Sequence, residues 1–280
     1  MIDRVDAHHH LWSVEPTVPG WLVPDEMAPI SRSFTTADLA AAVGGTGVVA
    51  TVLVQTVHEV LETEQFLGVA DLTPLIAAVT GWVDLTDEGV ADELARLAEV
   101  PGGSYLRGIR HGAQGEADNG WLARPEVIDG VRAVGAAGLV YELLTIPPQL
   151  TAATALVRAL PDVAFVLDHA SKPLIATDGW HPWADDIAAL AALPNVVCKL
   201  SGMVTEDTPG WTAQHLQRYV DHLLSTFGPG RLLFGSDWPV CLLRTDYAGW
   251  VNAADALTAA LSDDERTAIF AGNARAFYSL

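Results

Sequence analysis

The sequence contains few positive charges and few cysteines. Its 280 residues carry 35 acidic side chains against 15 lysines and arginines, which gives a formal net charge of −20. A chain with this excess of negative charge repels the phosphates of nucleic acids and anionic membrane surfaces. Two cysteines, Cys198 and Cys241, are too few for a disulfide framework. We therefore expect a cytoplasmic protein that binds a small-molecule substrate, not nucleic acid or a membrane.

Long apolar runs are also missing. The sequence has no stretch of about 18 apolar residues, the length that a membrane-spanning helix needs, and its first ten residues, MIDRVDAHHH, contain no apolar signal core. Half of all residues are nevertheless hydrophobic and only 18% are charged. Such a chain can bury a large core, and its composition differs from that of a disordered protein.

Apolar, β-branched segments alternate with helical patterns along the whole chain. The expected strands are about 32 residues apart on average, close to the length of a strand–helix–strand unit. They begin near Val5, Val48, Ile76, Leu106, Leu139, Ala164, Val196 and Leu232. Between them, Thr35 to Asp38 has the form of a helix capping box, and residues 214–227 place apolar side chains on one helical face. This alternation predicts an α/β fold, a single (β/α)₈ TIM barrel over residues 1–280.

The competing architecture is an open, doubly wound sheet, which usually carries a glycine-rich nucleotide-binding turn after its first strand. Here the first strand instead runs into His8, His9 and His10. Loop lengths also favour the barrel, because the segments after the expected strands are long and those before them are short. The long loops therefore crowd one mouth, where barrel enzymes have their active sites: residues 12–33, 112–121, 171–182, 201–211 and 238–247.

Histidines at the end of the first strand are candidates for metal binding. Residues two positions apart on a strand point to the same side, so His8 and His10 can face the barrel mouth together, whereas His9 points away and is expected to be structural. Paired imidazoles suit a transition metal such as zinc. The alternative is a histidine pair that is hydrogen-bonded inside a packed loop.

Two further strands end in residues that can bind a metal or move a proton. The sixth expected strand is followed by His169, and the last one by Asp237. A carboxylate after a buried apolar run needs a partner, because an unpaired buried charge is strongly unfavourable. A metal ion, a water molecule or a nearby cation would serve. The alternatives are a helix cap or a salt bridge for Asp237 and a purely structural role for His169.

Lysine is rare, with two lysines against thirteen arginines. Lys172 lies just beyond His169, and Lys199 lies inside an apolar strand, where a lysine is seldom buried without a partner. Each could bind a carboxylate or polarise a carbonyl, and a structural ion pair is the alternative for each. Arg110, near the end of the fourth strand, could grip substrate oxygens through its planar guanidinium, with a salt bridge at the barrel lip as the alternative.

Aromatic and polar residues at other strand ends are further candidates. Tyr141 and Glu142 end the fifth strand, and one of them should face inward, while Gln55 is a weaker candidate near the end of the second. Aromatic rings at strand ends or in the long loops could line an apolar or sugar-ring pocket, with loop packing as the alternative. Seven of the nine tryptophans occupy such positions: Trp12, Trp21, Trp121, Trp180, Trp183, Trp211 and Trp238.

These segments together resemble the amidohydrolase superfamily. The resemblance is greatest to its lactonase branch, which includes L-fuconolactone, L-rhamnonolactone and 2-pyrone-4,6-dicarboxylate hydrolases. It spans nearly the whole chain and rests on a combination of motifs: DAHHHLW (6–12), LRGIRH (106–111), VLDHASKP (166–173), KLSG (199–202), FGSDWP (234–239) and GNARAFY (272–278).

The resemblance implies a barrel of the metal-dependent hydrolase type. One divalent metal, with zinc as the first choice, would lie between His8, His10, His169 and Asp237, although the similar pyrone lactonases work with none. Lys199 stands where many members of the superfamily have a histidine, which argues against a two-metal site.

The implied function is the opening of a lactone ring in a sugar acid or a related small carboxylate. Asp237 would act as general base, with His169 and Lys199 as catalytic partners. The expected substrate-binding residues are Arg110, Tyr141, Lys172 and Trp238. The alternatives are a metal-dependent decarboxylase of the same superfamily and a catalytically inactive binding protein on a barrel scaffold. Exposed barrel helices also allow a homodimer.

Overall fold

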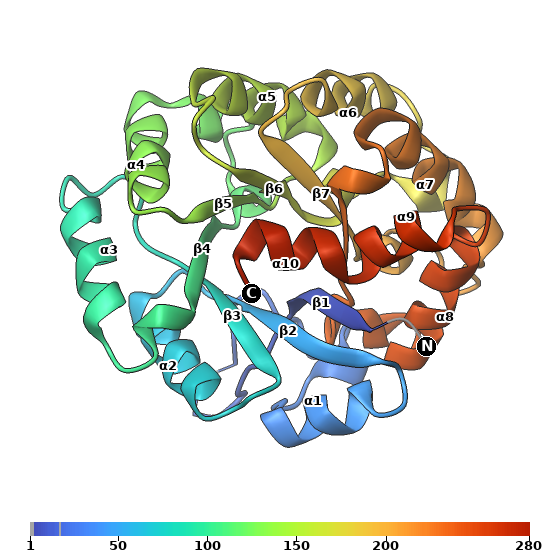
Figure 1. The fold of residues 1–280 in the computed structure, drawn as a ribbon, viewed down its shortest axis with the longest axis horizontal. Helices are drawn as coiled ribbons and strands as arrows, with labels where there is room; N and C mark the ends of the chain where they lie inside the picture. Colours follow the sequence, from blue (N-terminus) through green and yellow to red (C-terminus); the bar gives the residue numbers. More distant parts are fainter. Residues whose placement is uncertain (1–2, 17) are drawn as a thin grey trace.

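Eight parallel strands form one sheet whose spatial order follows the sequence (Figure 1). The computed structural model describes residues 3–16 and 18–280. The strands are β1 (Arg4–His9), β2 (Val48–Val54), β3 (Ile76–Gly81), β4 (Leu106–His111), β5 (Val140–Leu143), β6 (Phe165–Leu167), β7 (Val196–Leu200) and β8 (Leu232–Phe234). Each begins within one residue of its expected position. The predicted (β/α)₈ barrel is confirmed, and its extent as a single domain over residues 1–280 stays a prediction.

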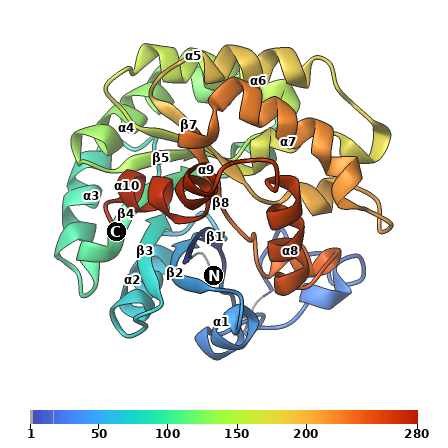
Figure 2. The same ribbon diagram turned by 45° about the vertical axis from the view of Figure 1, so that its right-hand side comes forward.

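Helices follow the strands and lie around the outside of the sheet (Figures 1 and 2). They are α1 (Thr36–Val43), α2 (Val60–Asp71), α3 (Val90–Glu99), α4 (Pro125–Ala136), α5 (Leu150–Ala159), α6 (Trp183–Ala191), α7 (Ala213–Phe227), α8 (Tyr247–Leu257), α9 (Asp263–Thr267) and α10 (Asn273–Tyr278). Helix α1 begins at the expected capping box, in which the Thr35 and Asp38 side chains each accept the other residue's backbone N–H. Over residues 3–16 and 18–280, no helix has both the length and the apolar character needed to cross a membrane.

The first and last strands meet through the residues that follow β8. The Asp237 N–H donates to the His8 carbonyl at 2.8 Å, and the His10 N–H donates to the Trp238 carbonyl at 2.7 Å. His9 and Trp238 form the corresponding parallel bridge. These contacts bring the two ends of the sheet together and place the end of β1 beside the loop after β8.

Alternation along the strands divides the apolar side chains into two cores. The outer core lies between strands and helices and includes Leu53, Ile109 and Phe165. The inner core fills the N-terminal half of the barrel with small and β-branched side chains, and α10 together with the turn before it contributes its last members: Val5, Ala7, Val52, Val54, Ala78, Val140, Val166, Val197, Leu233, Ala271, Ala274 and Tyr278. Figure 1 shows α10 crossing the centre of the ring. Because this end is plugged, the open end of the barrel is the one at the C-terminal ends of the strands.

Candidate active site

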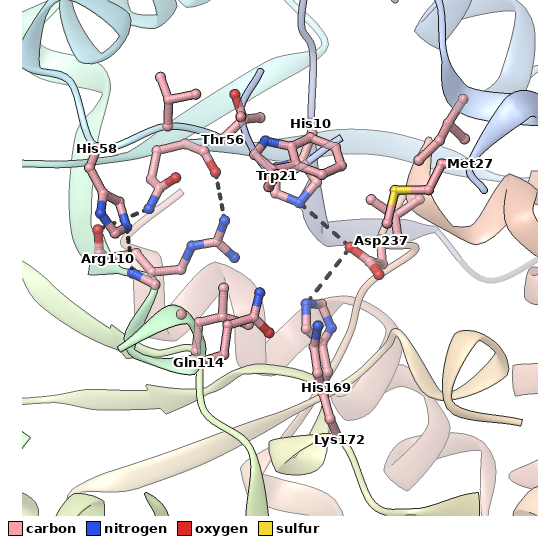
Figure 3. Close-up of a pocket in the computed structure, with 18 of the residues that line it drawn as sticks. His10, Trp21, Met27, Thr56, His58, Arg110, Gln114, His169, Lys172 and Asp237 are labelled. Carbon is pink, nitrogen blue, oxygen red and sulfur yellow. Dashed lines mark hydrogen bonds and ion pairs between the residues drawn. The ribbon is translucent and has the colours of Figure 1, made fainter. Parts of the chain in front are cut away.

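Three imidazoles and one carboxylate meet at the C-terminal ends of β1, β6 and β8. The Nε2 atoms of His8 and His10 are 3.1 Å apart. The Oδ1 atom of Asp237 lies 3.8 Å from His8 Nε2, 3.5 Å from His10 Nε2 and 3.7 Å from His169 Nε2. Figure 3 shows Asp237 between His10 and His169. The four side chains come from widely separated parts of the sequence, and all of them are buried.

This donor set fits a divalent metal. Zinc binds nitrogen and oxygen at about 2.0–2.1 Å, so the ligand atoms of a tetrahedral site lie about 3.3 Å apart. The separations around Asp237 are close to that value. His10 Nδ1 lies 2.8 Å from the Val54 carbonyl and donates to it, which leaves the Nε2 lone pair directed at the site. His169 Nδ1 lies 2.8 Å from Ser201 Oγ, which fixes the orientation of that ring.

Opposing electrostatic effects act on the Asp237 carboxylate. Burial raises its pKa, but the neighbouring His169 and His10 imidazoles and the charge of Lys172 together lower it below its ordinary value. Asp237 is therefore ionised near neutral pH. A buried, ionised carboxylate beside imidazoles can bind a metal and accept a proton from water.

A left-handed turn positions His169. Residues 169–172 have φ angles of 51°, 51°, 57° and 51°, and none of them is glycine. Left-handed backbone costs L-residues about 1–2 kcal/mol each, so the turn requires support from its surroundings. Its first carbonyl accepts the Lys172 N–H at 2.9 Å, its second accepts Trp183 Nε1 at 2.8 Å, and its serine hydroxyl bonds Thr145 at 2.8 Å. Strain of this kind gathers at functional sites, and Asp237 shares the conformation, with φ of 55°.

A network of buried charges lies beneath His8. Lys199 Nζ is 2.6 Å from Glu142, 3.0 Å from Asp168 and 3.0 Å from His8 Nδ1. Arg110 Nη1 donates to Asp168 at 3.0 Å. Burial raises the pKa of Asp168, but the charges of Lys199, His8 and Arg110 outweigh it and hold that pKa well below its ordinary value. Two cations thus neutralise two carboxylates in the barrel centre.

Lys199 therefore lies away from the open cavity. Its side chain is fully buried and is engaged by Glu142 and Asp168. Strand β7 directs the side chain into the barrel below His8, and the expected role of Lys199 as a catalytic partner stays a prediction. Lys199 thus has the position expected of a structural ion pair, the alternative considered above. Its contact with His8 Nδ1 links it to the site.

Two expected substrate-binding residues also lie elsewhere. Tyr141 belongs to the outer core, where its ring packs edge-on against Phe165 at 6.2 Å, and Glu142 is the inward-facing residue of β5. Neighbouring residues on a strand point to opposite sides of the sheet, and the sequence left open whether Tyr141 or Glu142 pointed inward. Trp238 is also in the outer core, with its ring 5.3 Å from that of Phe34. Neither side chain lines the cavity described below, and substrate binding by Tyr141 and Trp238 stays a prediction.

A cavity of about 640 Å³ opens above the four side chains, and its two walls differ in polarity. Loops after β1 and β8 supply the apolar wall: Trp21, Met27, Ile30, Val240 and Leu243. Segments from the ends of β2 and β4 supply the polar wall: Gln55, Thr56, His58, Glu59, Arg110 and Gln114. Of the seven tryptophans considered, Trp21 is the one that lines this cavity. Figure 3 shows His58 and Gln114 across from Met27 and Asp237.

Arg110 reaches the cavity but is already engaged. Its Nη2 atom donates to the Gln55 carbonyl at 2.6 Å, while its Nη1 atom bonds Asp168 and lies 3.3 Å from His8 Nε2. The Gln55 amide returns a hydrogen bond to the Arg110 carbonyl at 3.1 Å. Arg110 is therefore held rigidly between β2 and β6 and presents only part of its guanidinium to a ligand.

The sequence analysis named neither Gln114 nor His58 as a site candidate. Gln114 lies on a short turn after β4, within a loop whose length was the one available signal. His58 accepts the Gly112 N–H at 3.0 Å and its ring stacks on that of Trp82 at 5.7 Å. Burial lowers the pKa of His58 to about 4, with help from His111, so this imidazole is neutral at pH 7.

The barrel is parallel, and its imidazoles and carboxylate gather at the ends of the first, sixth and eighth strands. This combination defines a class of barrel hydrolases. The chain belongs to the amidohydrolase family, whose model (Amidohydro_2, "Amidohydrolase") matches residues 5–280. The predicted family and the prediction that the protein is a hydrolase are both confirmed.

Proteins of similar sequence match this chain over nearly its full length and nearly all of their own. The chain is 37% identical over 284 residues to an L-fucono-1,5-lactonase of Burkholderia ambifaria, with all of this chain and 97% of the relative covered. It is 34% identical over 291 residues to an L-fucono-1,5-lactonase of Burkholderia multivorans, covering 99% of this chain and 96% of the relative. A crystal structure of a Burkholderia multivorans amidohydrolase with bound zinc superimposes with a TM-score of 0.94, at 35% identity and 99% coverage of both chains.

Proposed function

We propose that this amidohydrolase opens the ring of a sugar-acid lactone by hydrolysis. The observation that carries the proposal is the ionised Asp237 carboxylate facing three imidazoles in a cavity large enough for a sugar ring. The two relatives with named activities are L-fucono-1,5-lactonases, which supports lactones as the substrate class and L-fucono-1,5-lactone as the first compound to test.

Asp237 acts as the general base. It takes a proton from the water that attacks the lactone carbonyl, and the low pKa of this carboxylate keeps it ready for that step. A divalent metal, for which zinc is the first choice, would be held by His8, His10, His169 and Asp237 and would stabilise the negative charge that develops on the carbonyl oxygen.

The remaining cavity residues bind and orient the sugar ring. Gln114 and His58 on the polar wall can hydrogen-bond ring hydroxyls, and the free face of Arg110 can hold an oxygen. Trp21 and Met27 give the less polar face of the ring an apolar surface to pack on. We therefore expect the hydroxylated face of the ring to lie toward β2 and β4 and its carbonyl to lie toward Asp237.

The deciding experiment is a panel of lactones followed with a pH indicator, together with metal analysis of the purified protein. Hydrolysis releases one proton for each ring opened, whereas a decarboxylase of the same superfamily releases CO₂ and an inactive binding protein releases neither. Asp237→Asn should lower kcat by about 10²–10⁴-fold, the usual contribution of a general base, with the fold unchanged by circular dichroism. Full activity of that variant would exclude Asp237 as the base.

A further inference from the structure

Within the described part of the chain, the apolar wall of the cavity presents no side-chain group suited to hydrogen-bonding a sugar hydroxyl. Four of its members, Met27, Ile30, Val240 and Leu243, have hydrocarbon or thioether side chains, and a thioether is only a weak acceptor. The fifth, Trp21, has a donor in Nε1, but that atom is buried from solvent. The wall can therefore cover carbon, whereas its five side chains offer a hydroxyl no replacement for water.

Backbone contacts place this wall next to Asp237. The Cys241 N–H donates to the Asp237 carbonyl at 2.9 Å, so the helical turn Val240–Leu243 begins directly after that residue's loop. The turn packs against a second short helical turn, Ala28–Ile30, which Met27 precedes. Figure 3 shows Met27 beside Asp237. A lactone whose carbonyl faces Asp237 therefore has the apolar wall as its neighbour.

The hydrogen-bonding groups of the cavity lie on its other sides. Figure 3 shows Arg110 and Gln114 across the cavity from Met27, and Lys172 on the far side of His169 from it. Lys172, one of the expected substrate-binding residues, thus lines the cavity but lies away from the apolar wall. The cavity has a hydrogen-bonding side and an apolar side, and the proposed reacting groups lie between them.

The ring of a 1,5-lactone has two edges of the same kinds. Its carbonyl carbon is joined on one side to C2, the first of the hydroxyl-bearing carbons, and on the other side to the ring oxygen, which leads to C5 and its substituent. The hydroxyl-bearing edge belongs against the polar wall, because a hydroxyl that is buried without a hydrogen bond is unfavourable. With the carbonyl facing Asp237, the edge that carries C5 then lies against the apolar wall.

We propose that the apolar wall determines specificity at C5 of the lactone and accepts a methyl group there in preference to a hydroxymethyl group, an inference that rests on the proposed function. A methyl group against Met27 and Leu243 removes apolar surface from water, which is favourable. The hydroxyl of a hydroxymethyl group would lose its water and gain no side-chain partner on this wall. Because a hydrophobic pocket discriminates against an added hydroxyl by no more than about 10²-fold, we expect a preference of about 10–100-fold.

The test compares kcat/KM of the wild type for L-fucono-1,5-lactone and L-galactono-1,5-lactone, after subtraction of spontaneous hydrolysis. The second compound differs from the first only in carrying hydroxymethyl instead of methyl at C5. We expect the fuconolactone to be favoured by about 10–100-fold, and a preference below about tenfold would overturn the inference. Activity on other lactones but on neither of these two would also overturn it. A wild type that opens no lactone would overturn the proposed function itself, which keeps the two failures distinguishable.

Variants test whether the wall causes the preference. Met27→Gln keeps a side chain of similar size and adds an amide that can bond the extra hydroxyl, so the preference should fall by about threefold or more. Met27→Leu remains apolar and should keep it. Gln114→Met, on the polar wall, should lower kcat/KM for both lactones and leave their ratio unchanged. An unchanged preference in Met27→Gln would overturn the proposal, and Leu243→Gln repeats the test from the other turn if Met27→Gln lowers Tm.

Discussion

The carboxylate of Asp6 and residue Ser236 are 230 positions apart in the sequence and share two hydrogen bonds. The Ser236 N–H donates to Oδ1 at 2.7 Å and its hydroxyl donates to Oδ2 at 2.6 Å. The same carboxylate accepts the His8 N–H at 3.0 Å and the Tyr247 hydroxyl at 2.8 Å. Asp6 therefore joins the backbone that carries His8 to the backbone that carries Asp237.

Replacing Asp6 should loosen this junction. Asp6→Ala leaves four donors without their acceptor in a fully buried site, and each unsatisfied buried group costs about 1–3 kcal/mol. We expect a loss of about 3–5 kcal/mol in the free energy of unfolding, together with a 10–100-fold loss of metal affinity, as is typical when supporting contacts are removed. Urea unfolding and zinc titration measure the two effects. Asp38→Ala, which removes an exposed cap, is the matched control, and equal losses in both variants would contradict the prediction.

The charge network under His8 gives a second prediction. Lys199→Met leaves Glu142 and Asp168 without their shared cation, and breaking a buried ion pair costs about 3–5 kcal/mol. Lys199→Met combined with Glu142→Gln should lose less than the sum of the two single variants, because the contact they share is counted once. A double-mutant cycle from chemical denaturation gives the coupling. Strict additivity would argue against an energetic link between the two residues.

Metal removal should affect stability as well as activity. A ligand at 100 times its Kd stabilises the folded state by about 2.7 kcal/mol, so chelation should lower Tm, and added zinc should restore it. His10→Ala should abolish this response, because His10 supplies one of the converging Nε2 atoms. His215→Ala is the control, since His215 lies on α7 within hydrogen-bond distance of Asp207 and is not among the residues that line the cavity. An unchanged Tm after full chelation would favour an enzyme that works without metal.

His58 should titrate far below an ordinary histidine. Its pKa is lowered to about 4 by burial and by His111. Between pH 6.5 and 4 the unfolded chain binds a proton at this position and the folded chain does not, so His58 lowers the stability as the pH falls through that window. NMR titration should give a pKa near 4, and His58→Gln should lose less stability than the wild type between pH 7 and pH 5. A measured pKa of 6 or more would contradict the expected environment.

Much of the fold could be predicted because it depends on local periodicity. Apolar runs with regular spacing predicted the start of every strand to within one residue, and Thr35 and Asp38 predicted the start of α1. The two-residue period of a strand indicated that His8 and His10 share a side. The same rule could not decide whether Tyr141 or Glu142 faces the barrel interior, because both follow an apolar run and either could point inward.

The sequence by itself determined the barrel class, the clustering of polar residues at strand ends and the pairing of His8 with His10, since each follows from patterns within a few residues. Only the tertiary structure decided that Asp237 meets these histidines, that Lys199 is enclosed below them while Lys172 stays open to the cavity, and that Gln114 lines its polar wall. The physical reason is that strand register and barrel closure set distances between residues far apart in the chain, and no local pattern encodes those distances.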